Sequence, residues 1–145
     1  MANRNDALAE PAVPRLVLSP AAIIAIAIGG ALGTVARFLL DTTFNETTGH
    51  FPITTLVINL SGSLAIGLLV PLLDDVAQRR PLIRPFLMVG VLGGWTTYST
   101  LAVEATLLAK DGDVADCVAY LAATVAGGLA LVVAGHALGR RMVPA

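Results

Sequence analysis

A run of glycines and hydroxyl side chains lies inside an apolar stretch, where a membrane helix is hard to continue. The run spans Gly93–Thr100 (GGWTTYST), and apolar sequence flanks it on both sides. Glycine costs about 1 kcal/mol relative to alanine in a helix, and threonine is stiff at χ1. In hydrocarbon, a break in a helix survives only where protein, water or a bound ion satisfies the freed carbonyls. We therefore expect an ion or substrate site at this break.

Two further sets of polar side chains recur four residues apart, which places each set on one helical face. Thr55, Asn59 and Ser63 form the first set, and Tyr120 and Thr124 form the second. The asparagine amide has N–H donors and a carbonyl acceptor, so it can coordinate an ion of either sign or join two helices. Hydroxyls also bond back to their own helix. Together the two sets favour a polar pathway, with helix–helix bonding as the alternative.

Two ionisable residues, Arg37 and Glu104, lie within or near the ends of apolar stretches. A charge inside a membrane costs at least a few kcal/mol on insertion scales, so each residue is a functional candidate. Arg37 is near enough to the end of its stretch to reach the interface or a helix end, and we prefer such a structural role to ion binding. Glu104 shares a helical face with Thr97, Thr100 and Leu101, and is paired, protonated or facing water.

The composition places the chain in a membrane. Of its 145 residues, 56% are hydrophobic and 13% are charged, whereas a soluble domain of this length needs more polar surface. The net charge of −1 and the lack of a basic cluster argue against a nucleic-acid partner. Cys117 is the single cysteine, which excludes an internal disulfide. We find no nucleophile or histidine–carboxylate arrangement and do not expect an enzyme.

Four segments are long enough to cross a bilayer, since a spanning helix needs roughly 20 mostly apolar residues. Short polar connections separate them, and the sequence shows no internal repeat. We therefore predict one all-α integral membrane domain over residues 20–139, with a polar cytoplasmic tail over 1–19 and a short basic tail over 140–145. The predicted spans are residues 20–40, 52–73, 82–109, which is broken near its middle, and 114–138.

Basic residues lie almost entirely on one side of the predicted domain. Lys110 stands alone on the other side, against seven arginines in the two tails and the second connection. The positive-inside rule then places both termini in the cytoplasm of a multi-pass plasma-membrane protein. The seven arginines are Arg4, Arg15, Arg79, Arg80, Arg84, Arg140 and Arg141.

Small residues recur at helix-packing spacing in the first and fourth spans. Gly29 with Gly33, and Gly135 with Gly139, form such pairs. They let backbones approach closely, which is how helices associate in lipid. We prefer packing within one bundle to a dedicated dimer contact. Four short helices hardly enclose a polar pathway alone, so we also expect an oligomer.

Three sequence motifs fall in the first three predicted spans. They read GGALGTVARF at residues 29–38, TTLVINLSGS at 54–63 and GVLGGWTTYST at 90–100. Together they resemble the CrcB/Fluc family of fluoride channels, and the resemblance covers all four spans. It implies a passive channel that lets cytoplasmic fluoride leave the cell and so reduces fluoride toxicity. It also implies an antiparallel dimer with two pores around a central structural sodium ion.

The resemblance also assigns roles to individual positions. The sodium ion falls to the backbone carbonyls of Gly93 and Thr96, with the same pair from the other subunit. Unwound carbonyls are hard oxygen ligands that suit a small cation. The family arginine matches Arg37. With the polar sets above, the candidate fluoride path comprises Asn59, Thr55, Ser63, Tyr98, Thr100, Tyr120 and Thr124.

Two positions depart from the family pattern. The family motif has two phenylalanines whose ring edges line the fluoride path, where this chain has Tyr98 and Leu101. Leucine has no aromatic edge, which suggests one altered pore lining. Because a basic bias fixes one orientation, we expect a related, oppositely oriented subunit as the partner, and a homodimer is the alternative.

Two other classes of function are open. Small four-helix exporters of cationic drugs also form antiparallel dimers, but they use a carboxylate in the first span, and this chain has none before Asp41. A non-conducting accessory protein is the other class. The polar sets on two spans argue against it, whereas Leu101 argues for it.

Overall fold

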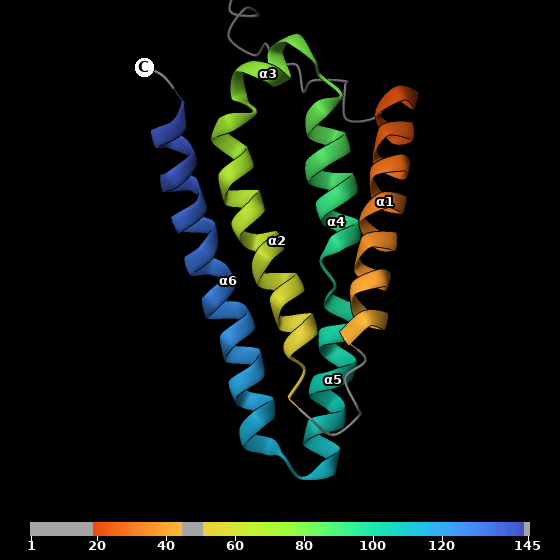
Figure 1. The fold of residues 1–145 in the computed structure, drawn as a ribbon, viewed down its shortest axis with the longest axis vertical. Coiled ribbons are helices and arrows are strands. Elements are labelled where there is room, and N and C mark those ends of the chain that lie inside the picture. Colours follow the sequence, from red (N-terminus) through yellow and green to blue (C-terminus); the bar gives the residue numbers. More distant parts are fainter. Residues whose placement is uncertain (1–18, 45–50, 144–145) are drawn as a thin grey trace, which may run out of the picture.

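The computed structural model describes residues 19–44 and 51–143, and this part of the chain is helical without a strand. Four stretches are long and apolar enough to cross a membrane, which confirms the predicted all-α fold with four spans. Residues 1–18 of the predicted tail over 1–19, together with residues 45–50 and 144–145, lie outside the described part. The helices are α1 (Pro20–Phe44), α2 (Ile53–Leu72), α3 (Asp74–Arg79), the π-helix η3 (Pro85–Val91), α4 (Leu92–Trp95), α5 (Tyr98–Asp111) and α6 (Val114–Met142) (Figure 1).

Three helices run beyond the predicted ends of their spans, and α5 does so by reaching Asp111. α1 continues to Phe44, because the hydroxyls of Thr42 and Thr43 donate to the Leu39 carbonyl at 3.0 and 2.6 Å near its end. Such side-chain donors satisfy carbonyls that the last turn of a helix leaves without a partner. α6 continues to Met142, so the first three residues of the predicted basic tail, both arginines included, are helical.

The spans form two close pairs, α1 with η3 and α4, and α2 with α6 (Figure 1). Glycines lie at both contacts. A Cβ on Gly90 would lie 2.8 Å from the Ile26 carbonyl oxygen, and one on Gly135 would lie 2.5 Å from the Leu64 carbonyl oxygen. Close packing within the chain is therefore confirmed for the predicted residues Gly29, Gly33, Gly135 and Gly139.

Adjacent glycines on α1 provide a matched test of this packing. A Cβ on Gly29 would lie 3.0 Å from the Val91 nitrogen, whereas the nearest atom to a Cβ on Gly30 is the Gly90 carbonyl oxygen at 3.9 Å. We expect Gly29→Ala to lower the free energy of unfolding by about 1–3 kcal/mol through overpacking. Gly30→Ala is expected to leave it unchanged or raise it by up to about 1 kcal/mol, because alanine favours a helix. Thermal unfolding of both variants in one detergent makes the comparison, and equal losses of stability would contradict the packing described.

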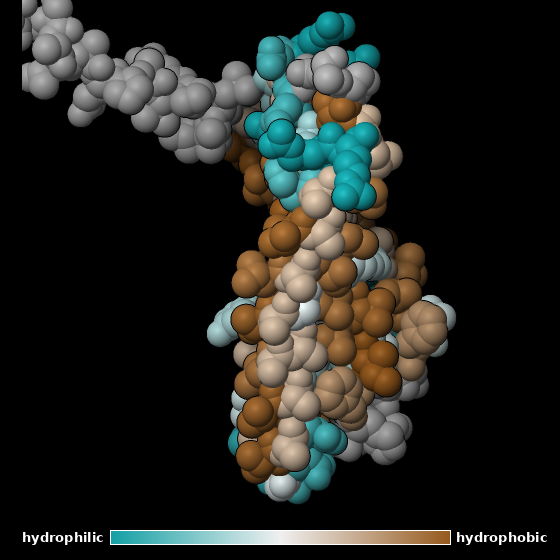
Figure 2. All heavy atoms as spheres, turned by 90° about the vertical axis from the view of Figure 1, so that its left-hand side faces the viewer, coloured by the Kyte–Doolittle hydropathy of each residue, from teal (hydrophilic) through white to brown (hydrophobic). Residues whose placement is uncertain are grey.

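Large apolar side chains cover the outside of the spans. On α6, Val125, Leu129 and Val133 recur every four residues and are 68%, 68% and 63% exposed. Figure 2 views this side of the molecule, where apolar residues fill the middle of the surface and hydrophilic residues gather at the upper end. An exposed apolar band of this kind suits the hydrocarbon of a bilayer. The chain is a multi-pass membrane protein.

The two ends of the bundle differ in charge. The start of α1, all of α3 and the end of α6 lie at one end, and the turn between α5 and α6 lies at the other (Figure 1). Lys110 is close to that turn, in the last turn of α5. The basic bias of the sequence is therefore a difference between two membrane faces. The described arginines of the first end are Arg79, Arg80, Arg84, Arg140 and Arg141.

Candidate functional site

The third span is interrupted at Thr96 and Thr97, between α4 and α5. Thr96 has φ −74° and ψ 154°, and Thr97 has φ −142° and ψ 125°, so both are extended. Before the break, α4 ends where the Thr96 N–H donates to the Leu92 carbonyl at 2.9 Å. After the break, the Thr97 hydroxyl caps α5 by accepting a 3.1 Å bond from the Thr100 N–H. Each half-helix thus has a defined end at the break.

Asn59 of α2 holds the break through both polar groups of its amide. Its Nδ2 donates to the Thr97 carbonyl at 3.0 Å, and its Oδ1 accepts from the Thr97 N–H at 2.9 Å. Asn59 is only 9% exposed, so these bonds are shielded from water. The helix–helix role considered for this asparagine is therefore present. Besides these two bonds, the amide can donate one further Nδ2 hydrogen and accept at one further Oδ1 lone pair.

The predicted metal ligands Gly93 and Thr96 are residues whose carbonyls lose their usual helical donors. In a continuous helix the Gly93 carbonyl would accept from the Thr97 N–H, which instead donates to Asn59. The Thr96 carbonyl would accept from the Thr100 N–H, which instead donates to the Thr97 hydroxyl. Two hard carbonyl oxygens whose usual N–H donors bond other acceptors are chemically suited to a small cation.

Space beside Gly93 is also open. Nothing lies within 4 Å of the position a Cβ would take on this exposed glycine. Hard cations in proteins take about six oxygen ligands, so two carbonyls from one chain form only part of a site. Among the described residues, no group of three or more histidine, cysteine or acidic side chains could hold a metal. A cation at the break would therefore depend on backbone oxygens and on ligands from outside this chain.

Arg37 of α1 contacts the helix end just before the break. Its Nε donates to the Gly94 carbonyl at 3.2 Å, and its Nη1 lies 3.9 Å from Oδ2 of Asp41. A cation beside the last carbonyls of a helix is favoured by the helix dipole. Arg37 thus ties α1 to α4 through a structural contact, as the sequence analysis preferred.

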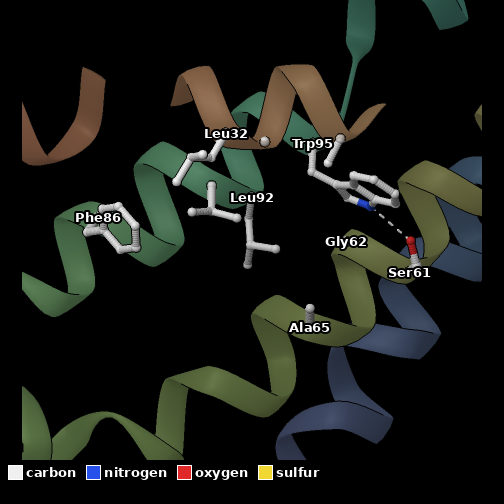
Figure 3. A pocket seen from close by; sticks show the side chains of 10 residues that line it. Leu32, Ser61, Gly62, Ala65, Phe86, Leu92 and Trp95 are labelled. Atoms are coloured by element: carbon white, nitrogen blue, oxygen red, sulfur yellow. Dashed lines mark hydrogen bonds between the residues drawn. The ribbon is translucent and has the colours of Figure 1, made fainter. Parts of the chain in front are cut away.

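Trp95, also just before the break, ties α4 to α2. Its Nε1 donates to the Ser61 hydroxyl at 3.0 Å, as Figure 3 shows for the indole that points across to α2. Ser61 in turn donates to the Ile58 carbonyl at 2.9 Å. The sequence analysis assigned no role to this pair, although the indole N–H of a tryptophan commonly finds an acceptor.

The same pair lies at an apolar groove of about 550 Å³ between α1, α2 and η3–α4 (Figure 3). Leu32, Ala65 and Leu92 are among its lining residues. It is nearly without polar groups, so it does not serve as an ion path. In a membrane it is a surface that lipid or another helix can cover.

A second groove, of about 280 Å³, joins several residues of the predicted fluoride path. It lies between α2, α5 and α6 and reaches the break. Leu101 also lines it and is 7% exposed, whereas Tyr98 is 82% exposed at its edge. The predicted path residues in its lining are Asn59, Ser63, Tyr98 and Thr124, together with the predicted metal ligand Thr96.

Glu104 of α5 joins two more predicted path residues. Its Oε1 accepts a 2.8 Å bond from the Thr55 hydroxyl, and its Oε2 accepts a 2.6 Å bond from the Tyr120 hydroxyl. Thr55 and Tyr120 are 3% and 0% exposed. The carboxylate therefore links α2, α5 and α6 one helical turn away from the groove. The structure thus pairs both oxygens of Glu104 with hydroxyl groups of neighbouring helices.

The hydroxyls of this region point toward protein acceptors. Ser63 donates to the Asn59 carbonyl at 2.9 Å, and Thr124 donates to the Tyr120 carbonyl at 2.9 Å. Thr100, which the path also included, differs, because its hydroxyl oxygen accepts a 2.9 Å bond from the Thr97 hydroxyl in the cap of α5. The Ser63 and Thr124 hydroxyls would have to rotate before they could donate to an anion in the groove.

Phe51 is an aromatic residue of this region that the sequence analysis missed. Its ring meets that of Tyr120 with centroids 5.7 Å apart and planes at 76°, an edge-to-face arrangement. It also packs on the cluster formed by Leu101, Ala105 and Leu108. The only sequence signal was an aromatic residue placed just before the second span.

Comparison with known proteins agrees with this architecture. Residues 24–136 match the family model described as "CrcB-like protein, Camphor Resistance (CrcB)". The chain belongs to this family. A relative named "Fluoride-specific ion channel FluC 2" from Nocardia farcinica is 42% identical over 123 residues, which is 85% of this chain and 88% of the relative.

Two further relatives of the CrcB protein carry the name "Fluoride-specific ion channel FluC". The one from Paracoccus denitrificans is 39% identical and matches 79% of this chain and 91% of its own length. The one from Rhodospirillum centenum is 41% identical and matches 83% of this chain and 97% of its own length. The match includes the break and the polar groove, so the family resemblance extends to the candidate site.

Proposed function

We propose that this CrcB protein is a fluoride-selective channel, or a subunit of one, that lets fluoride leave the cytoplasm passively and so reduces fluoride toxicity. The observation that carries the proposal is the groove between α2, α5 and α6, where Asn59, Ser63 and Thr124 line one polar surface within an apolar bundle. The names of the relatives support fluoride as the ion.

The groove supplies the groups that a small anion needs. An anion that leaves water must be given hydrogen-bond donors in place of its hydration shell. Asn59 has an Nδ2 hydrogen beyond its bond to Thr97, and the Ser63 and Thr124 hydroxyls can turn from their own backbones toward an ion. Glu104 holds the Tyr120 hydroxyl in one orientation next to this surface. The role we give Glu104 is to position donors.

We also propose a structural sodium ion at the carbonyls of Gly93 and Thr96. Bound there, a sodium ion would supply positive charge beside the extended residues of the break. The redirected N–H groups of Thr97 and Thr100 support these two carbonyls as ligands. The open space beside Gly93 supports a second subunit that brings the same pair, in an antiparallel dimer.

Tyr98 and Leu101 affect conduction differently. Tyr98 is 82% exposed at the edge of the groove, so its ring is available to an ion or to a second subunit. Leu101 is buried against Tyr120 and Ala105 in the apolar cluster and offers no aromatic edge. The lining from this chain is therefore altered at one position, which favours a partner that completes it.

We infer that the chain inserts in the plasma membrane in one orientation, with both termini in the cytoplasm, and pairs with a related subunit of opposite orientation. The arginine-rich end and the single Lys110 near the other end support this. When the chain is expressed alone, we expect a reagent that labels external thiols to modify a cysteine placed at Lys110 and not one placed at Arg141. Comparable labelling at both positions would show dual insertion and favour the homodimer instead.

Fluoride release from liposomes tests the proposed channel. The purified chain is reconstituted alone and with a candidate partner, and release of fluoride and of chloride is followed with ion-selective electrodes. We expect fluoride release without chloride release. No fluoride release in either preparation would overturn the channel and favour an accessory role. Proton-driven uptake of a cationic dye would favour the exporter class, although Asp41, the carboxylate nearest the first predicted span, lies beside Arg37.

A further inference from the structure

A third groove lies between the start of α1, the residues before η3 and the start of η3 itself. Its volume is about 550 Å³. Ile24 and Ile28 of α1 and Phe86 of η3 are among the apolar residues that line it, and Arg80 is the only charged residue of this lining. None of its lining residues belongs to the polar groove, the break or the Glu104 cluster.

Arg80 is the described arginine that lines this groove, and like Arg79, Arg140 and Arg141 it has no side-chain partner in the described part of the chain. Arg84 pairs with Asp74, and Arg37 donates to the Gly94 carbonyl. In the described part of the chain, by contrast, no carboxylate or carbonyl pairs with the guanidinium of Arg80, which is exposed. A bare cation at the edge of an apolar groove is complementary to an anionic group attached to an apolar chain.

The backbone fixes Arg80 at this place. Its N–H donates to the Val76 carbonyl at 2.8 Å, and its carbonyl accepts from the Ile83 N–H at 3.1 Å. Pro81 follows and disfavours the helical conformation for Arg80, which has φ −134° and ψ 79°. The backbone of Arg80 is therefore held beside the groove by a tight turn, from which the guanidinium can reach the groove edge.

The groove also has the length and depth of a lipid site. From Ala21 to Ile28 the helix rises roughly 10 Å at 1.5 Å per residue, about a third of the hydrocarbon core. Arg80 and its neighbour Arg79 lie at the arginine-rich end of the bundle, where lipid headgroups meet the protein. The upper part of an acyl chain could thus contact the apolar lining of the groove while its phosphate contacts Arg80.

We propose that this groove binds one anionic phospholipid, with an acyl chain along Ile24, Ile28 and Phe86 and the phosphate on the Arg80 guanidinium. The proposal rests on the membrane location of the spans and not on the ion that the channel conducts. A bound lipid would hold α1 against η3 from outside, at the end of the packing that Gly29 provides inside.

Lipid binding to the purified full-length channel tests the proposal. Delipidated protein in detergent is titrated with phosphatidylglycerol or phosphatidylcholine, and bound lipid is counted by native mass spectrometry. We expect Arg80→Gln to weaken phosphatidylglycerol binding about fivefold and to leave phosphatidylcholine binding little changed. The matched control Arg79→Gln, an adjacent exposed arginine outside the lining, should change either affinity by less than about twofold.

A second variant tests the apolar wall. Ile24 is 59% exposed, so Ile24→Trp is expected to fold while its ring fills the groove and reduces binding of both lipids. Equal effects of Arg79→Gln and Arg80→Gln would overturn the proposal, because they would show general surface attraction. The proposal would also be overturned if photoactivated phosphatidylglycerol labelled only peptides that contain neither Ile24 nor Phe86. That result would favour the N-terminal segment or a second subunit as the occupant of the groove. Fluoride release is assayed separately, so neither result decides the channel proposal.

Discussion

Replacing Asn59 with alanine is expected to slow fluoride release at least about tenfold and to destabilise the protein. The variant removes the partner of both the N–H and the carbonyl of Thr97, at the point where the third span is extended. A buried polar group without its partner costs about 1–3 kcal/mol, so the loss from both groups together is about 2–6 kcal/mol. The proposed conducting surface also loses its amide donor. Liposome release and thermal unfolding measure the two effects.

Two variants separate these effects. A protonated Asn59→Asp side chain keeps an acceptor for the Thr97 N–H and one O–H donor for the Thr97 carbonyl but has no further donor for an anion, so we expect partial recovery of stability without recovery of fluoride release. Ser61→Ala is the matched control on the same helix, because Ser61 is exposed and accepts only the Trp95 indole among the described contacts. It should cost about 0.5–1.5 kcal/mol and retain release. Normal fluoride release by Asn59→Ala would remove this residue from the path.

The spans were predictable because their signal is local. A stretch of about 20 apolar residues is recognised without knowing its neighbours, and glycine spacing showed which faces pack closely. The helix ends were less predictable: α1 reaches Phe44 because two threonines bond back to Leu39. The π-helical turns of η3 left no pattern that a period of 3.6 residues would reveal.

The pairings within the site could not be predicted in the same way. Spacing placed Thr55, Asn59 and Ser63 on one face, but only the packing of α2 shows that Asn59 meets Thr97, 38 positions away. Arg37 likewise meets Gly94 over 57 positions. Such contacts depend on the rotation of each helix and on which helices pair. The sequence motifs identified the candidate residues, whereas their hydrogen-bond partners follow only from how the helices pack.

Glu104 explains how hydroxyls from two helices form one unit. Its two carboxylate oxygens accept from Thr55 and Tyr120, both almost without exposure. Glu104→Ala would leave both hydroxyls without this acceptor, at about 1–3 kcal/mol each. We expect this variant to unfold more easily and to release fluoride at least about tenfold more slowly, which liposome release and thermal unfolding would measure. Retained stability would show that the carboxylate does not join the helices.

A double-mutant cycle tests whether Glu104 acts by positioning Tyr120. Tyr120→Phe removes the hydroxyl and keeps the ring against Phe51, 5.7 Å away. Glu104→Gln keeps the shape but has one acceptor oxygen for two hydroxyl donors, so one hydroxyl must turn away. We expect each single variant to slow fluoride release. When the effects are expressed as free energies, the double variant should lose less than the two single variants added together, with a coupling of about 0.5–3 kcal/mol. Fully additive effects would mean that the carboxylate and the phenol contribute independently, although they share a 2.6 Å hydrogen bond.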